Sequence, residues 1–305
     1  MTVLITGSTG LIGSHLIRKL KDEETVISLV HEDPRGRFQR ESLEGTVKVR
    51  GDVRDFNLLK STMSRYYVDR VYHLAALAEV KSAYKEPLNV YDVNVMGTVN
   101  VLEAARQIGV KRSLVLITDK VYGEQLKATE KAILHSSEPY ATSKVAAQLV
   151  AQSYVDTYGM DVVFPHSPNA FGLDYGNRIF PNTIRKCLMG QPPVIFTNDQ
   201  SIREYIYVED LVEQLKGIME GAEEPGSYNI ETGWVYDQRQ VVEEVLKSFP
   251  RLSPDLMTVN LPQQIQAQTM KSTRWSWSPG RSFGQAVVDT IAKFKEYEDD
   301  WRYPR

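Results

Sequence analysis

Residues 2–20 read TVLITGSTGLIGSHLIRKL, and they are the strongest indication of the fold class. A short β-branched run comes first, an amphipathic run follows, and Gly7, Gly10 and Gly13 stand at the junction. Glycines at a strand-to-helix junction allow a tight turn and let backbone N–H groups approach a pyrophosphate at the helix N-terminus, where the helix dipole favours negative charge. We therefore predict that these three glycines bind a dinucleotide.

The rest of the first half repeats this alternation of strand and helix. Further runs typical of strands are TVISLV (25–30), TVKVR (46–50), DRVYHLA (69–75), SLVLIT (113–118) and MDVVF (160–164), and helical stretches cover 11–20, 93–109 and 143–159. Apolar strands that alternate with amphipathic helices are typical of a parallel sheet with helices on both faces. We predict an α/β fold with a Rossmann-type, doubly wound parallel sheet.

After Pro165 this rhythm ends. Connections rich in proline, asparagine and glycine separate shorter elements, which indicates a smaller α/β substrate lobe in the C-terminal part. We expect a dinucleotide-binding domain of residues 1–165, rejoined by about 205–232. The substrate lobe is then expected to comprise 166–204 and 233–305.

The composition excludes several classes of function. A chain of 305 residues with 42% hydrophobic and 25% charged residues is ordinary for a globular protein. A net charge of −3 provides no wide positive field, so we expect no nucleic-acid partner. The single Cys187 cannot form an internal disulfide, the five histidines lack zinc-site spacing, and no run reaches the length of a membrane span. We expect a cytoplasmic protein without a metal site.

The identity of the dinucleotide stays open at this stage. An acid that holds the adenosine ribose is expected at the end of the second strand, but His31 stands there and acids follow one and two places later. Arg35 and Arg37 are placed to neutralise a 2′-phosphate instead, so both NAD and NADP remain possible. Asp52, after the third strand, is placed to meet the adenine edge, and a helix N-cap is its alternative role.

Three residues form a candidate catalytic set. Tyr140 and Lys144 stand four residues apart in YATSK and so share one face of a predicted helix. Thr118 ends the predicted fifth strand, at the sheet edge where doubly wound folds bind ligands. Lys144 can hold a nicotinamide ribose, and its charge is expected to lower the pKa of Tyr140. Tyr140 would then deprotonate a substrate hydroxyl while hydride leaves its carbon for nicotinamide.

With these residues the chain resembles the extended short-chain dehydrogenase/reductases that act on nucleotide-sugars. The resemblance runs along nearly the whole chain, through GSTGLIG (7–13), GDVRD (51–55), HLAA (73–76), NVMGTVNVLEAAR (94–106), TDKVYGE (118–124), YATSK (140–144), NAFG (169–172), REYIYVEDL (203–211) and WSP (277–279). It implies an NAD(P)-dependent enzyme whose partner is a nucleotide-diphosphate sugar.

The tripeptide that begins at Thr118 is similar to a narrower group. Asp119 and Lys120 complete a Thr-Asp-Lys sequence like that of CDP-glucose 4,6-dehydratases, whereas dTDP-glucose enzymes carry Thr-Asp-Glu. The resemblance implies that, once C4 is a ketone, Lys120 removes the C5 proton and Asp119 protonates the departing C6 oxygen. The alternative role for the pair is a turn cap and a solvent-facing lysine. A 4-epimerase or reductase, and a non-catalytic dinucleotide-binding protein, are the alternative functions.

The same resemblance implies substrate contacts. Asn169 and Arg203 match family positions that contact the phosphates of the nucleotide-sugar, and arginine suits a diphosphate through its planar donor fork. Asn177 and Arg178 are further candidates from the smaller lobe.

Two positions depart from the family pattern. His166 stands where most relatives have an arginine, and Phe171 replaces the usual tyrosine of the NAFG motif. We expect phosphate or packing contacts to differ there. Helices at 88–108 and 140–158 carry apolar faces that in this family commonly form a four-helix dimer interface, so a homodimer is expected; ordinary helices that face the sheet are the alternative.

Overall fold

The large sheet of the computed structural model contains eight strands, and all its pairings are parallel. The structure describes residues 1–199, 201–258 and 267–302. The strand order is β11-β7-β5-β4-β1-β2-β3, with β6 paired to β7. The strands are β1 (Thr2–Thr6), β2 (Thr25–Val30), β3 (Val47–Arg50), β4 (Arg70–His73), β5 (Arg112–Val115), β6 (Ile117–Thr118), β7 (Val162–Ser167) and β11 (Gly226–Asn229). The predicted doubly wound parallel sheet is confirmed.

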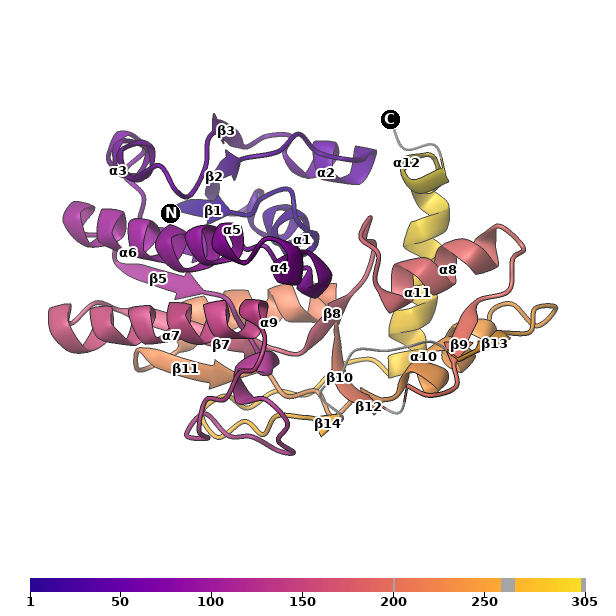
Figure 1. Cartoon of the computed structure of the whole chain (residues 1–305). Coiled ribbons are helices and arrows are strands. Elements are labelled where there is room, and N and C mark those ends of the chain that lie inside the picture. The colour runs from indigo at the N-terminus through magenta and orange to yellow at the C-terminus, as the bar shows by residue number, and fades with distance from the viewer. Residues whose placement is uncertain (200, 259–266, 303–305) are drawn as a thin grey trace.

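Helices form a layer on each face of this sheet (Figure 1). One layer holds α3 (Phe56–Arg65), α4 (Val80–Lys85), α5 (Pro87–Tyr91), α6 (Gly97–Ile108) and α7 (Pro139–Tyr158). A π-helical turn at Asp92–Met96 joins α5 to α6. The other layer holds α1 (Leu11–Leu20), α2 (Arg37–Ser42) and α9 (Val208–Gly221), of which α1 contacts both others. The buried aliphatic residues of the strands pack between these layers.

The predicted strand over 113–118 is interrupted at Leu116 and forms two strands, β5 and β6, because the ladder with β4 ends at Val115. β5 lies between β4 and β7 and pairs with both, and the Leu116 amide still donates to the carbonyl of His73 at 3.1 Å. β6 continues the pairing with β7 in the same register, so that Thr118 stands opposite Ser167. This pairing places Thr118 beside the end of β7, where the chain leaves for the smaller lobe.

The smaller lobe is built on a four-stranded sheet and a separate two-stranded one. The first contains β8 (Asn169–Phe171), β10 (Ile202–Tyr207), β12 (Val235–Tyr236) and β14 (Ala267–Gln268), and the second contains β9 (Val194–Phe196) and β13 (Asp255–Met257). The helices are α8 (Ile179–Leu188), α10 (Gln238–Leu246), α11 (Phe283–Glu296) and α12 (Glu298–Arg302).

The chain returns to the large sheet between the two parts of this lobe. β10 leads directly into α9, and β11 then pairs with β7, with Gly226 opposite Val163. The limits 1–165 with 205–232, and 166–204 with 233–305, stay a proposal. Residues 200, 259–266 and 303–305 of that second set lie outside the described residues.

Phe171 lies in an aromatic cluster of the smaller lobe. Its ring stacks on Phe180 with centroids 4.1 Å apart and meets the edge of Phe283 at 5.7 Å. Its side chain is buried, so the departure from tyrosine leaves no hydroxyl to satisfy in this apolar place. In the described part of the chain, no helix combines the length and apolarity that crossing a membrane requires.

Candidate active site

The glycine-rich turn forms a cradle that side chains would fill. Gly7 has φ +69°, and a Cβ there would stand 2.7 Å from the amide nitrogen of Ala75. A Cβ at Gly13 would stand 2.1 Å from the carbonyl oxygen of Gly7. Gly10 is the N-cap of α1 and has no side chain to cap the helix, so the first N–H groups remain available to an anion. The cradle fits a pyrophosphate.

Asp52 lies after β3 and contacts two neighbouring side chains. The Arg54 guanidinium donates to Oδ2 at 2.6 Å, and the His31 ring lies 3.5 Å from the same oxygen. Hydrogen bonds from Arg54 hold the pKa of Asp52 below its usual range. The N-cap of α3 is Asp55, which accepts from the Leu58 amide, so the alternative role of Asp52 as a helix cap is wrong.

The arginines considered for a 2′-phosphate are held elsewhere. Arg37 donates to the carbonyl of Glu296 at 2.8 Å, and its guanidinium lies 4.7 Å from the ring centroid of Tyr297. Arg35 faces Glu32 across 3.5 Å at the surface. The C-terminal helices therefore take up the side chain of Arg37 in this structure.

Thr118, Tyr140 and Lys144 come together at the carboxyl edge of the large sheet. Glu138 caps α7 and accepts from the amides of Tyr140 at 2.9 Å and Ala141 at 2.7 Å, which fixes the first turn. Tyr140 and Lys144 are buried one turn apart. The hydroxyl of Thr118 contributes a hydrogen bond to Tyr140.

Burial governs the titration of these groups. Burial raises the pKa of Tyr140, and the charge of Asp119 raises it further. The hydrogen bond with Thr118 and the charge of Arg178 lower this pKa by smaller amounts. Burial also lowers the pKa of Lys144 to about 8. The expectation that Lys144 brings the pKa of Tyr140 toward neutrality is therefore wrong for the protein alone, since both charged forms lose hydration in this site.

Asp119 and Lys120 lie within the same site. The Thr118 hydroxyl donates to Oδ1 of Asp119 at 2.9 Å, and the Lys120 Nζ lies 3.6 Å from that oxygen. Lys120 also donates to Oδ1 of Asn169 at 3.0 Å. Asp119 is 1% exposed, and among the described residues its Oδ2 has no hydrogen-bond partner. Thr118 is the residue that caps the following turn, so the alternative of a capping Asp119 and a solvent-facing Lys120 does not hold.

The other proposed substrate residues lie around this centre without joining it. Arg203 is half-buried on β10 and donates to the carbonyl of Ile202. Arg178 caps α8, donates to Asp174 at 2.8 Å, and its charge lowers the pKa of Tyr140, so it lies within electrostatic reach of the site. Asn177 is exposed just before α8.

Sequence reasoning did not foresee the support of α7. Asn94 lies buried in the π-helical turn, where it accepts from the Leu77 amide at 2.8 Å and donates to Ser143 at 2.8 Å. Ser143 in turn donates to the carbonyl of Tyr140 at 2.6 Å. For Glu138 a signal was available, since it precedes Pro139, a residue favoured at the first position of a helix.

His166 contacts Gln148 and Tyr122 inside the first lobe. It is fully buried, its Nε2 donates to Gln148 at 2.8 Å, and its Nδ1 lies 3.2 Å from the Tyr122 hydroxyl. Burial lowers the pKa of His166 to about 3, so the ring is neutral near pH 7.

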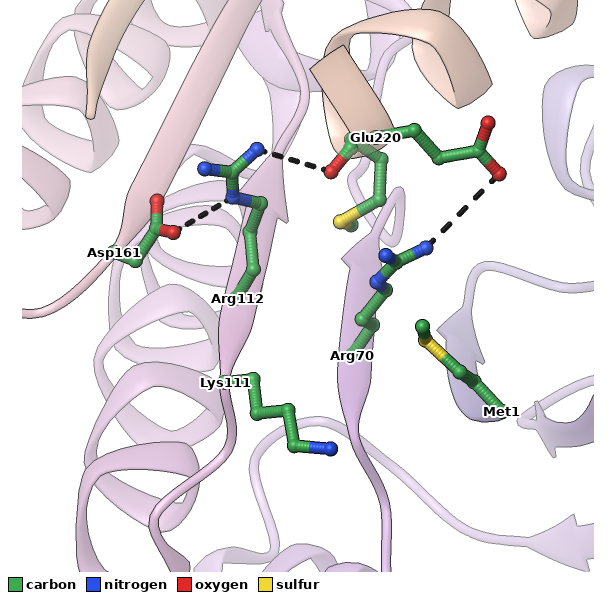
Figure 2. A pocket seen from close by; sticks show the side chains of 7 residues that line it. Met1, Arg70, Lys111, Arg112, Asp161 and Glu220 are labelled. Carbon is green, nitrogen blue, oxygen red and sulfur yellow. Dashed lines mark hydrogen bonds and ion pairs between the residues drawn. The ribbon is translucent and has the colours of Figure 1, made fainter. Parts of the chain in front are cut away.

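A hollow of about 280 Å³ lies at the edge of the sheet opposite the candidate catalytic residues (Figure 2). Arg70 and Arg112 begin β4 and β5 there, and both face acidic or carbonyl oxygens. The catalytic candidates instead follow the carboxyl ends of the strands, where parallel α/β sheets bind their ligands.

The parallel sheet, the glycine cradle and the buried Thr118–Tyr140–Lys144 set define a dinucleotide-binding α/β protein of the short-chain dehydrogenase/reductase type. The chain belongs to the NAD dependent epimerase/dehydratase family, whose sequence profile matches residues 3–230. The expected family is therefore confirmed.

Three similar proteins illustrate the range of this family. The dTDP-glucose 4,6-dehydratase of Haemophilus influenzae is 27% identical over 342 residues, which cover 95% of this chain and 97% of that protein. A dTDP-glucose 4,6-dehydratase from Streptomyces venezuelae with NAD bound is 25% identical, with a TM-score of 0.87 and 99% of both chains covered. A Thermus thermophilus UDP-glucose 4-epimerase in complex with NAD is 26% identical, with a TM-score of 0.86 and coverage of 97% of this chain and 99% of the other.

These relatives include both dehydratases and epimerases, so the fold alone does not choose the reaction. The two dehydratases are named for dTDP-glucose, and the narrower resemblance to CDP-glucose enzymes stays a proposal.

Proposed function

We propose that the chain is an NAD-dependent nucleotide-sugar 4,6-dehydratase. The observation that carries the proposal is the position of Asp119 and Lys120 next to Thr118, with one buried Asp119 oxygen left for a ligand. An epimerase needs only the Thr118, Tyr140 and Lys144 set, whereas elimination of water needs an additional acid and base.

The cofactor site supports NAD. Gly7, Gly10 and Gly13 would hold the pyrophosphate, and Lys144 would hold the nicotinamide ribose. Bound NAD would supply the hydride acceptor at C4 of the sugar and, once reduced, the hydride donor at C6. The contacts of Arg37 with the C-terminal helices leave its charge away from a 2′-phosphate, which supports NAD over NADP.

In the oxidation step Tyr140 takes the proton of the C4 hydroxyl as hydride leaves C4. Burial opposes the tyrosinate, so a positive charge near the phenol is needed. Lys144, with a pKa of about 8, is largely protonated near pH 7 and supplies one such charge. Thr118 hydrogen-bonds with both Tyr140 and Asp119 and so joins the oxidation base to the elimination acid.

In the elimination step Lys120 takes the C5 proton, the C6–O bond breaks, and Asp119 protonates the oxygen, which leaves as water. Hydride then adds to C6 and Lys120 returns a proton to C5, giving a 4-keto-6-deoxy sugar. The pair must therefore start as an amine and a carboxylic acid, which together hold as many protons as the ion pair.

Two finer features belong to this proposal. The Thr-Asp-Lys tripeptide supports a CDP-glucose-type substrate, and the names of the relatives support dTDP-glucose.

A homodimer is supported by exposed apolar residues on neighbouring helices, Leu88 on α5 and Leu149 on α7, which are 85% and 58% exposed. The molar masses of wild type and Leu149→Glu, measured by light scattering, test the homodimer. A monomeric wild type would contradict it.

The test of the reaction is incubation with CDP-, dTDP-, UDP- and GDP-hexoses, followed by mass spectrometry. Loss of one water from one of them, abolished by Lys120→Ala and by Tyr140→Phe, is expected. Lys131→Ala, at an exposed lysine, serves as the matched control and should keep full activity. An unchanged mass with a new 4-epimer by NMR would replace the dehydratase with an epimerase.

A further inference from the structure

We infer that Asn169 is a positioning residue for Lys120, and that it acts on the elimination step by holding the amine that removes the C5 proton. The inference rests on the proposed dehydratase, in which Lys120 is that base. It differs from the phosphate contact expected for Asn169, because here the amide oxygen is bound to the lysine at 3.0 Å.

The amide of Asn169 has one orientation only. Its Nδ2 donates to the backbone carbonyl of Glu204 at 3.0 Å. A carbonyl oxygen can only accept, so the amide nitrogen must face Glu204 and Oδ1 must face Lys120. Asn169 also stands on β8 opposite Tyr205 of β10, so its backbone is held by the same strand.

The strand that orients Asn169 is itself fixed by a buried carboxylate. Glu204 is 1% exposed and accepts from the amides of Thr232 at 2.6 Å, Gly233 at 3.1 Å and Met270 at 3.0 Å. These three amides come from two separate segments of the chain, around Thr232 and at Met270. Asn169 therefore presents its oxygen from a rigid support.

Such support is needed because lysine is a poorly preorganised base. Its ammonium or amine ends a flexible four-carbon chain, and holding it in one place loses side-chain entropy. One N–H of Lys120 directed at Asn169 fixes the nitrogen, and Asp119 lies 3.6 Å away. In the uncharged amine the lone pair then points away from Asn169, and a displacement of about 1 Å is enough to lower a rate by roughly 100-fold.

The experiment compares wild type with Asn169→Leu, which has a similar size and no hydrogen-bonding group. Rapid mixing of the NAD-loaded enzyme with the sugar found active in the panel follows the absorbance of reduced nicotinamide. We expect oxidation at C4 to persist, reduced cofactor to accumulate, and product formation to fall by about 100-fold. Lys120→Ala should show the same accumulation, and Tyr140→Phe should show none. Asn57→Leu, an exposed asparagine on α3, is the matched control.

The variant Asn169→Asp is tested by the pH dependence of elimination, which a general structural defect would not shift. It keeps an oxygen facing Lys120 but adds a negative charge, which favours the ammonium over the amine. The acid limb of the pH–rate profile for elimination should therefore move to higher pH. Both variants are compared by thermal unfolding to separate misfolding from displacement of the base.

Weaker substrate binding by Asn169→Leu with an unchanged rate of elimination would overturn the inference and assign Asn169 to the phosphates. Failure of the proposed function looks different, because wild type then converts no sugar to a dehydrated product. In that case the protein alone still tests the contact. The rate of acylation of Lys120 is measured against pH by peptide mass spectrometry. Compared with wild type, acylation should be slower in Asn169→Asp and faster in Asn169→Leu. Equal rates in all three proteins would contradict the contact between Lys120 and Asn169.

Discussion

The Nε2 of His166 donates to the amide oxygen of Gln148 at 2.8 Å, and this bond ties β7 to the helix that carries Tyr140 and Lys144. The other ring nitrogen lies 3.2 Å from the Tyr122 hydroxyl, three residues after Asp119. A neutral, buried pair thus joins two segments that carry candidate catalytic groups.

A charge placed in this pair should destabilise the protein. His166→Arg puts an uncompensated cation beside a neutral amide, and we expect a loss of about 3–5 kcal/mol in the free energy of unfolding. Adding Gln148→Glu supplies a partner and should recover part of that loss. Denaturant unfolding of the two single variants and the double variant measures the coupling, and a double variant no more stable than His166→Arg would refute it.

Buried neutral histidines should make the protein lose stability as pH falls from about 6.5. Burial lowers the pKa of His15 to about 4, and those of His73 and His166 to about 3, from 6.5. Below pH 6.5 the unfolded chain binds protons that the folded chain does not, so each group should contribute a slope approaching about 1.4 kcal/mol per pH unit.

Denaturant unfolding between pH 5 and pH 6 measures this slope. The variant His166→Gln should reduce this slope by up to one such contribution. Equal slopes for wild type and His166→Gln would show that His166 does not remain neutral in the fold.

Lys144→Met should stabilise the free protein and abolish catalysis. Burial lowers the pKa of Lys144 from 10.5 to about 8, so its charged form is disfavoured in the fold near pH 7. Removing the charge is expected to raise the free energy of unfolding by up to about 3 kcal/mol at pH 7. This gain should shrink as pH rises from 8 to 10.5, where the unfolded chain also loses its proton. Denaturant unfolding of wild type and Lys144→Met at pH 7 and pH 10 measures this difference in stability. A variant less stable than wild type at pH 7 would contradict the prediction.

Gly13→Ala should remove dinucleotide binding. The added Cβ would stand 2.1 Å from the carbonyl oxygen of Gly7, a backbone atom that cannot move without opening the cradle. We expect NAD to raise the melting temperature of wild type and to leave that of Gly13→Ala unchanged. Gly280→Ala, where a Cβ meets no atom within 4 Å, is the control. Undiminished stabilisation of Gly13→Ala by NAD would exclude this cradle as the pyrophosphate site.

The sequence alone determined the features that depend on local periodicity. The glycines at 7, 10 and 13 mark a strand-to-helix turn by their spacing, and Tyr140 and Lys144 share a face because a helix repeats every 3.6 residues. The doubly wound sheet followed from the alternation of apolar strands with amphipathic helices. Each of these patterns lies within a short stretch, where neighbours along the chain are also neighbours in space.

Tertiary structure alone decided which distant groups meet and how they ionise. The contact of Lys120 with Asn169 depends on the pairing of β6 with β7, which brings the ends of these two strands together. The bond of His166 with Gln148 depends on how α7 packs on β7. The pKa of Tyr140 likewise moved opposite to the expected direction, because burial depends on the whole fold and outweighs any single neighbouring charge.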